Sequence, residues 1–305
     1  MFAFLMAAAT PGEARLVVIG DSLSDTGNAY AGSSGVTPLS PPYWQGRFSN
    51  GPVWVERLAD ALGLPAPAPY FDPAVGGGTN FAVGGAATGG TLTAGDMDSQ
   101  VAALAIDPAF ADLSDDLVVV WGGANDFFGD PSGADPADSV ANLMAIVTEL
   151  IGLGADSLLL ANLPPLDQTP ELEGSGVPAQ AAAAAFALGF NTLYRAAVDE
   201  LMVRIPLVDF LFFDVYSAML DVIGDPSAYG FTNVTDPALT SSGVVPNPDE
   251  YLFWDGVHPT RAGHVELARI AASLVPAPPV LVLLLPGVIL LLARRAAPAG
   301  AKAAG

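Results

Sequence analysis

Four short apolar segments recur along the chain, and each is bounded by turn-forming residues. They are rich in Val, Leu and Ile and show no alternation of polar and apolar positions: Leu16–Ile19, Leu117–Trp121, Ser157–Leu160 and Ile205–Phe210. Strands buried on both faces of a parallel sheet have this pattern, because neither face meets water. The chain is therefore expected to build a parallel sheet that is covered on both sides.

Segments with helical patterning separate these runs. Apolar residues recur every three or four positions in Ser139–Leu150, and Ala179–Val203 is long and rich in alanine. Val53–Leu62 and Arg261–Leu274 are predicted as further helices. Strands that alternate with helices predict an α/β fold, a three-layer α/β/α sandwich with a central parallel sheet. Ligand sites in such sheets lie beyond the carboxyl ends of the strands.

Ser22 follows the first apolar run, within the sequence GDSLSDTGN. A serine hydroxyl is a poor nucleophile unless a base takes its proton and an acid orients the base. The chain has two histidines. His258 comes three residues after Asp255, a spacing at which the carboxylate can reach Nδ1 and leave Nε2 for the serine. His264 falls within the last predicted helix and is interpreted as a solvated surface residue.

Two further motifs offer hydrogen-bond donors for an oxyanion. In NFAVGGAAT, the backbone N–H groups of Gly84 and Gly85 allow close approach because glycine has no side chain. In GGANDFF, Asn125 carries an amide on a short side chain. With the N–H of Ser22, these donors can surround a developing oxyanion. Each motif alone is typical of turns or helix caps, so the inference depends on all of them occurring in this order.

The order and wording of these motifs resemble the GDSL, or SGNH, hydrolase family. GDSLSDTGN is similar to the first block of that family, with Ser22 as nucleophile and oxyanion donor. NFAVGGAAT is similar to the second, with Gly85 as an oxyanion donor, and GANDFF to the third, with Asn125 as the other. DGVHPT is similar to the fifth, with Asp255 and His258 completing the triad.

The resemblance covers about residues 15–275, which we take as the hydrolase domain, and GRFSNGPVWVERLADALGL and YGFTNVTDPAL resemble the longer esterase/lipase branch. It implies a flavodoxin-like α/β/α fold and hydrolysis of esters or thioesters without a metal or cofactor.

The residues and the resemblance together predict a serine hydrolase that cleaves carboxylic esters through an acyl-enzyme. Thioesterase, phospholipase and polysaccharide deacetylase activities are alternatives within the family, and a surface-anchored binding module without catalysis is the alternative outside it. The expected partner is a small-molecule or lipid ester. Nucleic acid is excluded as a partner, because 32 acidic residues against 10 basic ones repel a phosphate backbone.

Two loops look like insertions, Gly32–Asn50 and Gly224–Pro248. We expect their aromatic residues either to wall the acyl or alcohol pocket or to form the core of the loops themselves; these residues are Tyr30, Tyr43, Trp44, Phe48, Tyr229 and Phe231.

The two ends of the chain differ in composition from the rest. Residues 1–14 contain a short apolar stretch before small residues but no basic start, which is typical of an incomplete secretory signal. In 276–305, a proline-rich hinge precedes the apolar run Val280–Ala293 and two arginines, a layout that resembles the PEP-CTERM sorting tail of bacterial exported proteins. We therefore expect an exported protein (periplasmic, cell-surface or extracellular), with membrane anchoring and sorting-enzyme processing through this tail.

Overall fold

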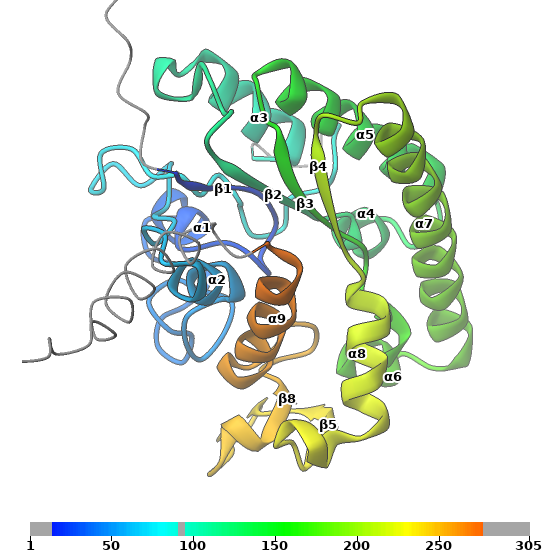
Figure 1. Ribbon diagram of the computed structural model, residues 1–305. Helices are drawn as coiled ribbons and strands as arrows, with labels where there is room; N and C mark the ends of the chain where they lie inside the picture. The colour runs from blue at the N-terminus through cyan, green and yellow to red at the C-terminus, as the bar shows by residue number, and fades with distance from the viewer. Residues whose placement is uncertain (1–13, 91–94, 277–305) are drawn as a thin grey trace, which may run out of the picture. The chain divides into compact units, whose positions relative to one another are not determined.

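The computed structural model describes residues 14–90 and 95–276, and its main sheet consists of four parallel strands (Figure 1). They lie side by side in the order β1 Leu16–Gly20, β2 Leu117–Trp121, β3 Ser157–Ala161 and β4 Asp209–Phe213. All residues of β1 and β2 are buried. Because the four strands are parallel, their carboxyl ends meet at one edge of the sheet.

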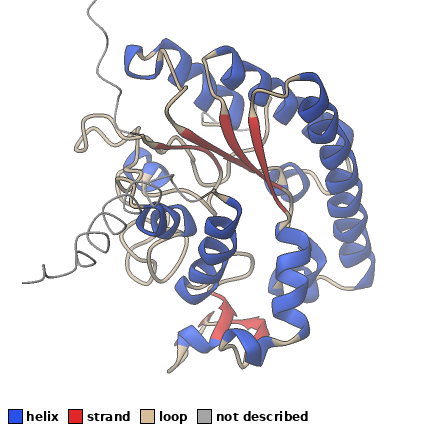
Figure 2. Cartoon of the chain, in the orientation of Figure 1, coloured by secondary structure: helices blue, strands red, loops and turns tan. Residues whose placement is uncertain are grey.

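Helices lie on both faces of this sheet (Figure 2). Their bounds are α1 Asn28–Gly32, α2 Trp54–Leu62, α3 Met97–Ile106, α4 Ala124–Gly129, α5 Pro136–Gly152, α6 Pro170–Glu173, α7 Val177–Arg204, α8 Val215–Gly224 and α9 Arg261–Leu274. Helices α3, α5 and α7 share one apolar core with alternate residues of the strands. Helices α2 and α9 pack against each other on the opposite face. The predicted fold class, an α/β/α sandwich around a parallel sheet, is confirmed.

Two smaller sheets lie in the second of the predicted insertions and just beyond it. Strand β5 Asn233–Pro237 pairs in parallel with β8 Tyr251–Phe253, and β6 Leu239–Thr240 pairs with β7 Gly243–Val244 in antiparallel fashion. The short parallel pair leads the chain directly to Asp255 and His258.

The segment 79–83 runs along the free edge of β1. Val18 donates to the carbonyl of Thr79 over 3.0 Å and accepts from the N–H of Phe81 over 2.8 Å, and Val83 donates to the carbonyl of Gly20 over 3.2 Å. These bonds fix the glycine-bearing loop that follows Val83 against the end of the first strand.

The fourth strand begins later than the sequence predicted. We expected Ile205–Phe210, but the strand runs from Asp209 to Phe213. Helix α7 continues to Arg204, and the N–H of Val208 closes a turn onto the carbonyl of Ile205. The apolar residues of that turn are therefore not a strand, and the side chain of Leu207 is 91% exposed.

The interpretation of His264 as a solvated residue is wrong. His264 is fully buried between α9 and α2, where its Nδ1 accepts the backbone N–H of Trp54 over 3.2 Å. Trp54 is the first residue of α2, so His264 satisfies one of the unpaired donors of that helix start. Burial, together with the charge of His258, lowers the pKa of His264 to about 3.

The predictions on the chain ends fall on residues 1–13 and 277–305, which lie outside the described residues. Within the described ranges, none of the helices combines the length and the apolar character needed to cross a membrane.

Candidate active site

Ser22 lies just beyond the carboxyl end of β1, where the backbone is closely packed. Gly20, the last residue of β1, has no room for a side chain, because a Cβ there would lie 2.5 Å from the carbonyl oxygen of Trp121. The side-chain amide of Gln100 accepts the N–H of Gly20 and donates to its carbonyl, over 2.9 and 2.8 Å. The strand end is thereby fixed two residues before Ser22, whose side chain is nearly buried.

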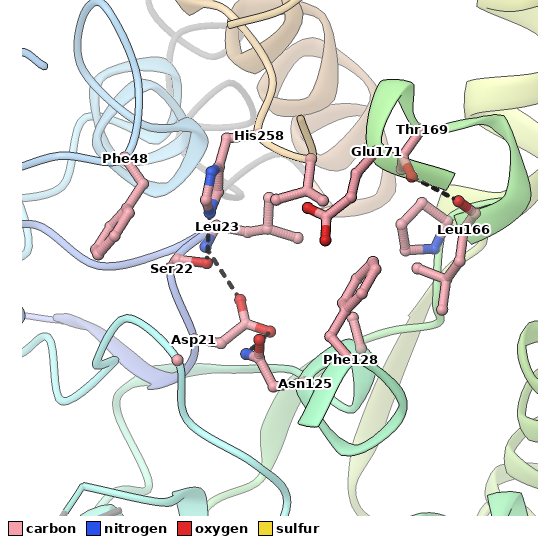
Figure 3. Close-up of a pocket in the computed structure, with 14 residues that line it drawn as sticks. Asp21, Ser22, Leu23, Phe48, Asn125, Phe128, Leu166, Thr169, Glu171 and His258 are labelled. Carbon is pink, nitrogen blue, oxygen red and sulfur yellow. Dashed lines mark hydrogen bonds between the residues drawn. The ribbon is translucent and has the colours of Figure 1, made fainter. Parts of the chain in front are cut away.

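Ser22 and His258, which are far apart in the sequence, lie next to each other at this end of the sheet (Figure 3), and Asp255 extends the hydrogen-bonded series from His258. Nε2 of His258 lies 2.8 Å from Oγ of Ser22. Nδ1 of His258 lies 2.7 Å from Oδ2 and 2.9 Å from Oδ1 of Asp255. The Oδ1 atom of Asp255 also accepts the backbone N–H groups of Val257 and His258, which holds the turn that carries the imidazole. The structure thus brings Ser22, His258 and Asp255 together in the order that the sequence predicted.

Tyr43 adds a contact that sequence reasoning did not predict. Its hydroxyl donates to Oδ2 of Asp255 over 2.7 Å, and its ring packs edge-on against Trp254. Burial works to raise the pKa of Asp255, but the charge of His258 and the hydrogen bonds from His258 and Tyr43 outweigh it and lower the pKa to about 2. Burial and the charge of Asp255 raise the pKa of Tyr43 above its usual range, so its hydroxyl keeps its proton.

The glycine loop with the predicted donor Gly85 is held in place by a buried carboxylate. Gly85 has a φ of +85°, and a Cβ there would meet nothing within 4 Å. The N–H of Gly84, which the sequence also suggested as an oxyanion donor, instead donates to Oδ2 of Asp25 over 2.9 Å. Asp25 is fully buried and also accepts N–H groups of 27–29, so it ties the glycine loop to the segment after Ser22.

Asn125 lies in the first turn of α4, and it lines the same pocket as Ser22 and Gly85. Its Nδ2 donates to the carbonyl of Ala86 over 2.9 Å and, over a longer 3.5 Å, to Oδ2 of Asp21, and these two bonds fix the amide. Its neighbour Asp126 accepts from Thr88 and Ser139, and this joins α4 to the glycine loop and to α5.

Asp21 is a buried carboxylate next to the serine. Its Oδ1 accepts the N–H of Leu23 over 3.0 Å, and its Oδ2 lies 3.5 Å from Nδ2 of Asn125. Burial raises the pKa of Asp21 to about 6, although the hydrogen bond from Leu23 and the charge of His258 both act to lower it. The site therefore contains a carboxyl group that titrates just below neutral pH.

The pocket above Ser22 has a volume of about 280 Å³ and a largely apolar wall. Its lining residues are Asp21, Ser22, Leu23, Phe48, Gly85, Ala124, Asn125, Phe128, Pro164, Leu166, Thr169, Glu171, Val257 and His258. In the described ranges there is no group of three or more His, Cys, Asp or Glu side chains that could hold a metal ion.

The expectation that both inserted loops wall this pocket is only partly right. Of the six aromatic residues proposed, Phe48 alone lines it, and its ring lies 5.2 Å from that of His258. Phe231 is buried, which agrees with the alternative prediction that these aromatic residues form the core of the loops themselves. The far wall comes instead from the segment after β3, through residues such as Leu166 and Glu171, which no sequence pattern had indicated.

Comparison with known protein families supports the resemblance that the sequence motifs indicated. Residues 16–271 match the family described as GDSL-like lipase/acylhydrolase. The chain belongs to this family. Its membership makes the protein a carboxylic ester hydrolase.

Curated relatives cover most of this GDSL-family chain. It is 27% identical to a phosphatidylcholine-sterol acyltransferase of Aeromonas hydrophila, over 87% of this chain and 91% of that protein. It is 29% identical to a GDSL esterase/lipase of Arabidopsis thaliana, over 85% and 86% of the two chains. Among solved structures, a GDSL-family lipolytic protein from Veillonella parvula aligns with a TM-score of 0.46 and 12% identity, over 85% of this chain and 96% of that one.

Proposed function

We propose that this GDSL-family enzyme hydrolyses carboxylic esters with Ser22 as nucleophile, His258 as general base and Asp255 as the group that orients the imidazole. The observation that carries the proposal is the unbroken series from Oγ of Ser22 to Nε2 of His258, 2.8 Å, and from Nδ1 to Oδ2 of Asp255, 2.7 Å. Hydrogen bonds of this length let a proton pass from the hydroxyl to the ring as the oxygen attacks.

In the first half of the reaction, Oγ of Ser22 bonds to the ester carbonyl carbon and His258 takes the hydroxyl proton. The carbonyl oxygen becomes an oxyanion, for which the N–H groups of Ser22 and Gly85 and the amide of Asn125 are the proposed donors. When the tetrahedral intermediate collapses, the bond to the alcohol oxygen breaks. His258 then gives its proton to that oxygen, and an acyl-enzyme and a free alcohol result.

In the second half, a water molecule gives a proton to His258 and bonds to the acyl carbon. Collapse of this intermediate returns the proton to Oγ of Ser22 and releases the carboxylic acid. The net reaction is one ester and one water giving one acid and one alcohol, so it needs no external oxidant or cofactor.

The substrate that this site favours is an ester with apolar groups around the carbonyl. Leu23, Phe48, Phe128 and Leu166 supply the apolar wall, and burial of such groups is the main source of affinity in a pocket of this kind. The name of the acyltransferase relative points to lipid esters as one source of the acyl group. A thioester, a phospholipid or an acetylated polysaccharide are the other substrates to compare.

The experiment that tests the proposal compares wild type with Ser22→Ala on p-nitrophenyl esters from acetyl to palmitoyl. We expect activity to disappear in the variant while circular dichroism and the melting temperature stay the same. A fluorophosphonate probe should label wild type at Ser22 and leave the variant unlabelled. Ester hydrolysis by Ser22→Ala at the wild-type rate would contradict the mechanism, and a folded wild type that neither hydrolyses esters nor reacts with the probe would favour the binding-module alternative.

Export and membrane association through the C-terminal segment are part of the proposal, and they rest on the composition of 1–14 and 276–305 alone. Fractionation of cells that express the full chain, beside a variant ending at Val275, tests this. We expect the full chain in an exported, membrane-associated fraction and the shortened one in the exported soluble fraction. Retention of the full chain in the cytosol would contradict it.

A further inference from the structure

Two carboxylates without a part in the proposed chemistry line the pocket, Asp21, which accepts the N–H of Leu23, and Glu171. Glu171, in the short helix α6, lines the same cavity as Ser22 and His258. Figure 3 shows its carboxylate turned toward the cavity. In the described ranges of the chain, no hydrogen bond or ion pair involves this carboxylate. A charge that faces a substrate pocket without a protein partner is available to a group of the substrate.

Glu171 is attached to the loop that carries the proposed general base. Its backbone N–H donates to the carbonyl of Gly256 over 2.9 Å. A Cβ on Gly256 would lie 3.2 Å from Cβ and 3.3 Å from Oε2 of Glu171, so the glutamate side chain lies directly over this glycine. In the proposed mechanism His258, two residues further on, protonates the leaving alcohol. Glu171 therefore lies beside the loop that, in the proposed mechanism, delivers the proton to the leaving alcohol.

The pocket holds no positive side chain that would neutralise Glu171. Among the described residues, neither lysine nor arginine lines it. Every arginine within 14–90 and 95–276 already has a carboxylate partner elsewhere: Arg15 with Asp116, Arg47 with Glu56, Arg57 with Asp60, Arg195 with Asp199, Arg204 with Glu200, Arg261 with Asp249 and Arg269 with Glu266. An anionic alcohol would meet repulsion from Glu171 and would find no cation, whereas a cationic alcohol would meet attraction.

We propose that Glu171 is a specificity-determining residue which favours esters whose alcohol carries a cationic nitrogen, such as choline and related amino-alcohol esters. The proposal rests on the proposed ester hydrolysis at Ser22. Phe128 and Phe48 line the same cavity, and aromatic faces attract quaternary ammonium groups. The carboxylate and the rings together provide both the charge and the apolar surface that such a group requires.

The test uses two esters of the same shape and different charge: butyrylcholine, and 3,3-dimethylbutyl butyrate, in which carbon replaces the nitrogen. Wild type should have the higher kcat/KM for the choline ester. Glu171→Gln should lower that preference about fivefold, mainly through KM, because a partly exposed ion pair is worth up to about 1 kcal/mol. The kcat/KM for the neutral ester should change by less than about twofold, because no charge pair is lost with it.

Glu173→Gln is the matched control. It removes the same charge from the same helix, but Glu173 does not line the pocket. It should leave the choline preference unchanged, and salt at about 1 M should weaken the preference of wild type because ions screen the pair.

The inference is overturned if wild type has no preference for the choline ester, or hydrolyses neither of the two. It is equally overturned if Glu171→Gln slows both esters alike, or if Glu173→Gln alters the ratio as much. Failure of this inference is distinguished from failure of the proposed ester hydrolysis by the p-nitrophenyl esters and Ser22→Ala: activity on those esters together with any of these results overturns the role of Glu171 alone.

Discussion

Oδ2 of Asp255 accepts the hydroxyl of Tyr43 over 2.7 Å and lies 2.7 Å from Nδ1 of His258. The tyrosine comes from the loop between α1 and α2, 212 positions before the aspartate. One carboxylate oxygen is thus shared between the imidazole and a phenol, which fixes the orientation of the carboxylate. Tyr43 does not line the pocket, so its effect on the reaction passes through Asp255.

We predict that Tyr43→Phe lowers kcat about tenfold while KM stays within about twofold, since a hydrogen bond to a charged group contributes about 1.5–3 kcal/mol and part of this is regained from water. Tyr70→Phe is the matched control, because the Tyr70 hydroxyl donates to Asp107 over 2.8 Å away from the pocket. Steady-state kinetics of both variants checks the prediction. Equal effects of the two substitutions would show that Tyr43 is only a structural residue.

Asn125→Ala tests the proposed oxyanion donors. Loss of one donor is expected to lower kcat by about 10²-fold with little change in KM, because the oxyanion exists mainly in the transition state. Asn247→Ala removes an amide that donates to Glu250 outside the pocket, and it should retain full activity. A rise in KM at constant kcat would mean that Asn125 binds the ground state instead.

Asp21 is predicted to reduce stability at neutral pH. Its pKa in the folded chain, about 6, is raised above the ordinary value of 3.8 chiefly by burial. The stabilising effect of the protonated group is complete below about pH 4 and is lost as the pH rises through about 6. Asp21→Asn keeps an oxygen for the N–H of Leu23. It should raise the free energy of unfolding by about 1–3 kcal/mol above pH 7 and leave it unchanged near pH 4. Urea unfolding at the two pH values measures this, and a variant less stable than wild type at pH 8 would contradict it.

His264 has the opposite dependence. Its folded pKa, about 3, lies below the ordinary value of 6.5, so the unfolded chain binds the extra proton between these values. Stability from this group is therefore lost as the pH falls below about 6.5, by up to about 1.4 kcal/mol per pH unit. His264→Gln can still accept the N–H of Trp54 but does not titrate in this range.

Any loss of stability in His264→Gln relative to wild type should shrink as the pH falls from about 7 to about 4.5, because only wild type loses stability through this group. The contribution of Asp21 is common to both proteins and cancels in the comparison. Urea unfolding at several pH values follows the difference, and a constant difference would contradict the prediction.

The elements predicted correctly from the sequence are those that depend only on the residue pattern of a single segment. Arg261–Leu274 and the long helix around Ala179–Val203 were predicted to within two residues, because local periodicity determines a helix. The start of β4 was predicted too early, because the apolar residues that follow α7 form a turn and not the beginning of the strand. The burial of His264 depends on which helix packs against α9, and that partner is more than 200 positions away.

For the candidate site, the motifs predicted which residues meet, and the structure brings Ser22, His258 and Asp255 within hydrogen-bond distance. Their catalytic roles stay proposals. Tyr43 and Glu171 were not predicted as site residues with these contacts, because each joins the site through a packing contact with a distant loop and neither belongs to a motif.

The bond from the N–H of Val83 to the carbonyl of Gly20 has a consequence for how the enzyme can be altered. Ser22 lies two residues after Gly20, and Gly85 lies two residues after Val83. These two short backbone segments therefore determine the distance between Ser22 and Gly85. Residues added to the exposed turn around 73–77 would leave that spacing intact. A single residue inserted between 83 and 85 would displace Gly85 from Ser22. Redesign of the substrate range can therefore begin in the exposed turn around 73–77, with the two segments that follow Gly20 and Val83 left unchanged.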